Sequence, residues 1–125
     1  MSETYRLSFG QIIKLQDNLA EIIVDSDVEF NMAMIAEYHS WLLDHLNAPF
    51  ALLVNKKNPY TYTFDAQMNI ANLPEIKAMA VVAYSKVTEE STNVLIDMPR
   101  KSKWNIRIFD ERDLAMNWLQ AELAK

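Results

Sequence analysis

The stretch KAMAVVAY, residues 77–84, contains the longest unbroken apolar run of the chain, at residues 78–84. A continuous apolar run bounded by polar segments predicts a central strand that is covered on both faces. A second, shorter run at residues 50–54 is wholly apolar and predicts another strand. Two such strands indicate a sheet with helices packed on its faces.

Two helices are expected before the central strand. Apolar residues recur at helical spacing within residues 31–46, and Pro49 prevents this helix from continuing. A second helix is expected to begin near Thr63, whose hydroxyl could cap it, and to end before Pro74.

Two more helices are expected after the central strand. Thr88, followed by two glutamates, predicts the start of a helix that ends at Pro99. A short strand is expected at residues 106–109, and Asp110 is predicted to cap the last helix. The buried stripe of that helix is predicted to consist of Ala115, Trp118, Leu119 and Leu123.

The N-terminal third predicts β-structure. Residues 5–15 and 19–25 are rich in Leu, Ile and Val and are separated by the turn-forming residues 16–18. Gly10 interrupts the first run, which predicts a bulge or a bend. The expected order is therefore ββαβαβαβα in one domain, residues 1–125, with a mixed, mostly parallel sheet of four to five strands and about four helices.

Composition argues against several classes of function. The net charge of −5 disfavours a nucleic-acid partner, because phosphate backbones attract basic surfaces. The chain has one glycine, so neither type of glycine-rich phosphate loop can be present, and it has no cysteine to hold zinc or an iron–sulfur cluster. We predict no cofactor and no metal site.

The apolar runs are too short for a membrane span, and the first residues lack the apolar core of a signal peptide. We therefore expect a cytoplasmic protein.

Catalysis is not predicted. His39 and His45 stand six residues apart on one helix, about 240° around its axis, and so cannot share a metal ion. Serine, histidine and aspartate all occur, which leaves hydrolase chemistry as an alternative, but no pattern brings them together. Both histidines are more simply read as surface or helix-end residues.

Polar residues follow several expected strands. Ligands of open α/β sheets bind at the carboxyl ends of parallel strands, so these residues could line a site. The simpler alternative is that they are solvated loop and cap residues. The candidates are Asp25, Ser26, Asp27, Asn55, Lys56, Lys57, Ser85 and Asp110.

The segment before the second helix carries further candidates. Tyr60, Tyr62 and Phe64 alternate, so they form an adhesive aromatic face if exposed or close the end of the core if buried. Thr63 is a candidate phosphoacceptor at a helix N-terminus, or an ordinary N-cap.

A basic segment lies before Trp104. Arg100, Lys101 and Lys103 beside the indole ring favour either a solvated loop or weak contact with an anionic membrane surface.

The sequence IRIFD at 106–110, followed by ERDLAMNWL at 111–119, resembles the closing strand and helix of the STAS superfamily, in its SpoIIAA-like, STAS/Sec14-like branch. The resemblance covers nearly the whole chain in element order and implies a SpoIIAA-like fold. Anti-sigma antagonists of this superfamily carry a phosphorylatable serine in an Asp-Ser-Ser-Gly-type motif, whereas residues 60–65 here read YTYTFD. The phosphoacceptor of the family therefore has no counterpart in this chain.

Two functions are expected from this resemblance. The first is a non-enzymatic regulatory module that presents the second helix and its preceding loop to an unidentified protein partner. The alternative is a carrier of a small apolar molecule or lipid, held in an apolar cavity between helices and sheet. A weak homodimer through the first strand, at a sheet edge, is a further expectation.

Overall fold

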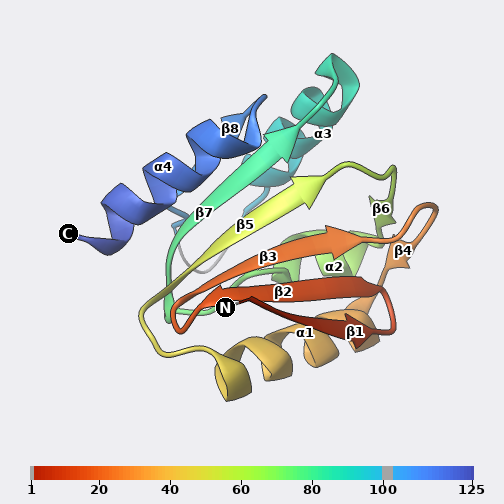
Figure 1. The fold of residues 1–125 in the computed structure, drawn as a ribbon. Helices are drawn as coiled ribbons and strands as arrows, with labels where there is room; N and C mark the ends of the chain where they lie inside the picture. Colours follow the sequence, from red (N-terminus) through yellow and green to blue (C-terminus); the bar gives the residue numbers. More distant parts are fainter. Residues whose placement is uncertain (1, 100–102) are drawn as a thin grey trace.

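A computed structural model describes residues 2–99 and 103–125, which form a six-stranded sheet covered by helices on both faces (Figure 1). The strand order is β1-β2-β3-β5-β7-β8. The first three strands pair antiparallel and the last four, beginning with β3, pair parallel. The strands are β1 Glu3–Leu7, β2 Gly10–Gln16, β3 Leu19–Val24, β5 Phe50–Lys56, β7 Ile76–Ala83 and β8 Ile106–Phe109.

The α/β class and the mostly parallel sheet are confirmed, but the predicted strand count is too low. Residues 5–15 form two strands, joined by a tight turn at Ser8 and Phe9, where one interrupted strand was expected. The turn reverses the chain, so Leu7 pairs with Gly10. The bend predicted at Gly10 is therefore a full reversal of the chain, and Phe9 in the turn is fully buried.

In the described part of the chain, three helices cover one face of the sheet and one covers the other. The first core cluster contains Tyr38 from α1, Ala66 from α2 and Leu95 from α3, whereas the second contains Ala115 and Leu119 from α4. The helices are α1 Met32–His45, α2 Phe64–Asn69, α3 Lys86–Ile96 and α4 Arg112–Leu123. All four helices were expected, and the alternation of strands and helices brings the carboxyl ends of the parallel strands to one end of the sheet (Figure 1).

A second, two-stranded sheet was not expected. β4 Glu29–Phe30 and β6 Thr61–Tyr62 pair parallel at the end of the main sheet. The backbone N–H of Thr63 extends this ladder by donating to the carbonyl of Phe30 at 2.9 Å. This pairing holds the segment that carries Tyr60 and Tyr62 against the core.

Two helix caps differ from the prediction. The third helix begins three residues earlier than expected, because Ser85 caps it by accepting a hydrogen bond from the N–H of Thr88 at 3.2 Å. The last helix begins after Glu111, whose side chain makes no capping bond, so Asp110 is not the N-cap. The expected cap at Thr63 is confirmed, since its hydroxyl accepts from the N–H of Ala66 at 3.2 Å.

Candidate ligand-binding site

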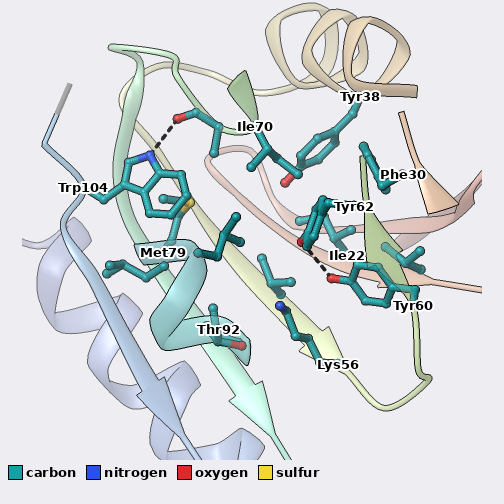
Figure 2. A pocket seen from close by; sticks show the side chains of 16 residues that line it. Ile22, Phe30, Tyr38, Lys56, Tyr60, Tyr62, Ile70, Met79, Thr92 and Trp104 are labelled. Carbon is teal, nitrogen blue, oxygen red and sulfur yellow. Dashed lines mark hydrogen bonds between the residues drawn. The ribbon is translucent and has the colours of Figure 1, made fainter. Parts of the chain in front are cut away.

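An apolar cavity of about 40 Å³ lies between the sheet and the three helices on its first face (Figure 2). Ile22, Val54 and Met79 contribute side chains from three neighbouring strands. Leu95 of α3 and the indole of Trp104 help to close it from the helix side. The cavity is therefore built from residues far apart in the sequence, and its lining is apolar except at one end.

Lys56 supplies the polar end of this cavity. It is the last residue of β5, and because side chains alternate along a strand it shares a face with Leu52 and Val54. Its side chain is partly buried, and its amine points into the cavity (Figure 2). Burial lowers the pKa of Lys56 from 10.5 to about 8.

Two tyrosine rings flank this amine. The Lys56 Nζ lies 5.4 Å from the ring centre of Tyr60 and 5.5 Å from that of Tyr62, within the range of a cation–π contact. The two tyrosine hydroxyls are hydrogen-bonded to each other at 3.2 Å. In the described part of the chain, the amine of Lys56 has no hydrogen bond and no ion pair.

A larger outer hollow of about 470 Å³ adjoins the cavity and shares Lys56 and Tyr60 with it. Its other walls come from the β3–β4 turn, with Asp27 and Val28, from the loop at Asn58, and from α3. The turn and the loop hold each other, since the N–H of Asp27 donates to the carbonyl of Pro59 at 2.7 Å. Lys56 and Tyr60 thus stand between the apolar interior and the hollow.

A chain of hydrogen bonds holds the opposite end of the cavity. The backbone N–H of Ala71 donates to Nε2 of His39 at 3.0 Å, and the indole N–H of Trp104 donates to the carbonyl of Ala71 at 3.2 Å. Ala71 has a φ of 58°, in the left-handed region that an alanine seldom adopts. Both the N–H and the carbonyl of Ala71 are therefore hydrogen-bonded to side chains from other segments.

The structure brings together only some of the predicted site residues. Lys56, Tyr60 and Tyr62 line the cavity, and Thr63 follows them as the N-cap of α2, with its hydroxyl partly buried. Phosphorylation of Thr63 stays a prediction.

Asn55 and Lys57 do not line the cavity. Alternation along β5 turns the side chain of Asn55 away from that of Lys56, and Lys57 follows the end of the strand. Asn55 is 7% exposed and donates from Nδ2 to Oε2 of Glu21 at 2.9 Å on the α4 face. Lys57 is exposed and acts electrostatically on the same glutamate.

The other polar candidates are also separate. Ser85 and Asp110 line a third hollow of about 340 Å³ together with Tyr84. Asp25 forms an ion pair with Arg6 at the edge of the sheet. Asp27 is the only member of this group that faces the outer hollow beside Lys56.

The three alternating aromatic residues differ in their burial. Tyr60 and Tyr62 are partly buried and pack on the core, whereas Phe64 is 67% exposed. Trp104 also packs on the core rather than facing outward as a membrane-surface ring would. Lys103 is exposed, while Arg100 and Lys101 lie outside the described residues.

Both histidines are engaged in structural contacts. His39 accepts the N–H of Ala71, and His45 stacks on Trp41 with ring centres 4.4 Å apart. Within residues 2–99 and 103–125, no cluster of three or more acidic or histidine side chains is arranged to hold a metal ion. Of the helices in those ranges, none combines the length and apolar character needed to cross a bilayer.

Sequence reasoning missed Tyr38, Thr92 and Trp104 as residues that line the cavity. Their contribution depends on how α1, α3 and the segment before β8 pack, which local patterns do not specify. One signal was present in the sequence: Lys56 continues the apolar face of Leu52 and Val54 at the spacing of a strand.

Comparisons with models of known protein families, with curated proteins and with solved structures found no match to this chain.

Proposed function

We propose that this domain binds a small, largely apolar molecule between its sheet and its first three helices, without transforming it. The observation that carries the proposal is the apolar cavity of about 40 Å³ that adjoins the outer hollow at Lys56. Protein interiors are close-packed, and an apolar cavity of more than one water's size is a poor site for water. An apolar group that enters from the hollow would restore the missing contacts.

The size of the cavity limits the ligand. A sphere of water size needs roughly 10–15 Å³ of such space, so about 40 Å³ admits about three atoms of that size. This is far below the volume that a long acyl chain needs. A short apolar group therefore suits the cavity as it stands.

The first test asks whether the cavity takes up a neutral apolar probe. Methyl-resolved NMR during titration with 3-methylbutanol should shift the methyl signals of Ile22, Val54 and Val81, which line the cavity. Val81→Leu should weaken these shifts by reducing the space, whereas Val94→Leu, at a residue that is 62% exposed on α3, should leave them unchanged. Shifts spread over the surface, or none, would count against the proposal.

A second candidate function, a docking module for a protein partner, is favoured by Phe64. Phe64 is the first residue of α2 and is 67% exposed, and it lies within the helix and preceding loop that were expected to meet a partner. Phe64→Ser should weaken a partner complex from native cells without loss of stability. The matched control is Leu114→Ser on α4, where the side chain is 48% exposed.

We also propose that the chain is a regulatory domain of the STAS type, with a SpoIIAA-like fold. What supports this is the closing strand Ile106–Phe109 and the helix Arg112–Leu123, which buries Ala115 and Leu119. Ligand occupancy would then be the signal that the domain reports. The test is a comparison of partner affinity with and without the bound small molecule.

A further inference from the structure

We infer that the ligand of this site is a short-chain aliphatic carboxylic acid, whose carboxylate pairs with the Lys56 amine while its apolar carbons fill the inner cavity. This inference rests on the proposed function, because it names the chemical class that the cavity would bind. It is carried by the position of the amine, which points into an apolar space and has no acidic partner among the described residues.

The first step concerns charge. A cation in an apolar site is costly unless an anion or several hydrogen bonds compensate it. The ring faces of Tyr60 and Tyr62 offset part of this cost through cation–π contacts at 5.4 and 5.5 Å. A negative group placed at the amine would supply the remaining compensation.

The second step concerns the kind of anion. Among the described residues, the polar groups that line the two cavities with Lys56 include the tyrosine hydroxyls, the carboxylate of Asp27, and the uncharged side chains of Asn58, Thr61, Thr88, Ser91 and Thr92. Among residues 2–99 and 103–125, the lining of either cavity includes no arginine and no second lysine. One cation matches a carboxylate, which carries a single charge, better than a phosphate, which carries up to two and binds best to an arginine fork or a cluster of donors.

The third step concerns length. If the carboxylate lies at Lys56, the carbons beyond it enter a cavity that admits about three atoms of water size. A butyrate or a 3-methylbutyrate places three or four carbons there. Longer chains would have to displace α3 or turn back into the outer hollow, and so should bind less well.

The pH dependence of binding follows from linkage. Burial lowers the pKa of Lys56 to about 8, so the amine is mostly charged at pH 7 and mostly neutral at pH 9. Burial also raises the pKa of Tyr38 and of Tyr60, which therefore stay neutral over this range. A bound carboxylate stabilises the charged amine, so affinity should be constant near pH 7 and fall by up to about tenfold per pH unit well above pH 8.

The experiment compares two probes of equal shape and different head group. Binding of 3-methylbutyrate and of 3-methylbutanol to the full chain is measured by NMR titration at pH 7 and at pH 9. We expect the acid to bind at least tenfold more tightly than the alcohol at pH 7, and this advantage to shrink at pH 9. The alcohol should bind equally at both pH values.

Two variants assign the effect to one amine. Lys56→Met removes the amine and keeps an unbranched apolar side chain that is one atom shorter, so it should abolish the advantage of the acid while still binding the alcohol. Lys57→Met removes the neighbouring, exposed amine and should bind both probes as the unmodified chain does. The amide NMR spectrum of each variant checks that the fold is kept.

The outcomes separate the two proposals. Equal affinity for the acid and the alcohol, with both in the cavity, would overturn the carboxylate inference and leave the proposed function standing. Binding of neither probe would overturn both. An acid advantage that survives Lys56→Met would place the carboxylate elsewhere and would also overturn the inference.

Discussion

Gly10 occupies a position where β2 runs too close to β3 for any side chain. A Cβ atom built there would lie 2.2 Å from the carbonyl oxygen of Ile23 and 2.9 Å from the Cα of Val24. Both are backbone atoms of a central strand, so neither can move without shifting the sheet. The φ of Gly10 is not positive, and glycine is therefore required by space rather than by backbone conformation.

We accordingly expect Gly10→Ala to lower the free energy of unfolding by about 1–3 kcal/mol, as overpacking in a core does. Chemical denaturation measures the loss. Gln11→Ala, on the next residue and the opposite face of β2, is the matched control and should change stability by less than about 0.5 kcal/mol. A neutral Gly10→Ala would mean that β2 and β3 lie farther apart.

His39 makes the protein sensitive to mild acid. Its Nε2 accepts the N–H of Ala71, so this nitrogen carries no proton, and burial lowers the pKa of His39 from its ordinary 6.5. The unfolded chain therefore binds a proton near pH 6.5 that the folded chain does not. Stability from this residue is fully present above pH 6.5 and is lost as the pH falls toward the lower, folded pKa.

Denaturation at pH 7.0 and pH 5.5 should show a smaller loss of stability in His39→Gln than in the unmodified chain, because glutamine offers an acceptor and does not titrate. An NMR titration of the His39 ring should give a midpoint below 6.5. A midpoint above 6.5 would show that the Ala71 hydrogen bond does not hold the neutral ring.

At the scale of elements, α4 is the only helix in the described part of the chain that covers the second face of the sheet, and an ion pair holds its N-terminus there. Arg112 donates from Nη2 and Nε to the two oxygens of Glu21 at 2.7 and 3.1 Å. The Glu21 side chain is 5% exposed. Burial raises its pKa, but the hydrogen bonds from Arg112 and Asn55 outweigh this effect, so the pKa of Glu21 lies below its ordinary value.

Removing the arginine leaves a buried carboxylate without its cation. We expect Arg112→Met to cost about 2–4 kcal/mol of unfolding free energy at pH 7, a range set below that of a fully buried pair because Arg112 is 40% exposed. The cost should shrink as the pH falls, because burial raises the pKa of Glu21 once the arginine is gone and the carboxylate of the variant can then be protonated. Denaturation across pH 4–7 measures this.

The matched control for this element is Arg107→Met. Arg107 is exposed and lies over the ring of Trp118, 5.6 Å from its centre, so its loss should cost under about 1 kcal/mol. A cost for Arg112→Met that does not depend on pH would point to lost packing instead of an unpaired carboxylate.

The helices and strands also show which structural features can be predicted from local sequence patterns. The helix at 31–46 and the strand at 106–109 were predicted within a residue or two, because their apolar spacing and the proline after α1 are local signals. The caps at Ser85 and Glu111 were missed because several capping residues stand close together, and packing decides which one is used. The hydrogen bonds of Glu21 with Arg112 and Asn55 join three segments that are distant in the chain, so no local sequence pattern predicts them.

At the scale of the whole molecule, stability is unevenly distributed. The strands β5 and β7 lie inside the sheet, each between two neighbouring strands, with apolar cores on both faces. By contrast, α3 exposes Val87 at 73% and Val94 at 62% and buries only Thr92 and Leu95. We expect α3 to open before the sheet does.

Native-state hydrogen exchange tests this order. Amides of α3 should exchange with an opening free energy at least about 2 kcal/mol below that of amides in β5 and β7. A ligand in the cavity should slow exchange in α3 more than in α4, because α3 lines the cavity and the hollow and α4 lines neither. Equal protection of α3 and the sheet would contradict this order of opening.

The sequence by itself determined the fold class, because strands and helices can be recognised from the local spacing of their apolar residues. It also identified Lys56, Tyr60 and Tyr62 as candidate site residues. Only the tertiary structure decided that these three meet at an apolar cavity while Asn55 and Ser85 lie elsewhere. The physical reason is that a cavity, a buried amine and a long-range ion pair are properties of packed surfaces. The segments that meet at these surfaces are far apart along the chain, and no local sequence pattern indicates that they will be in contact.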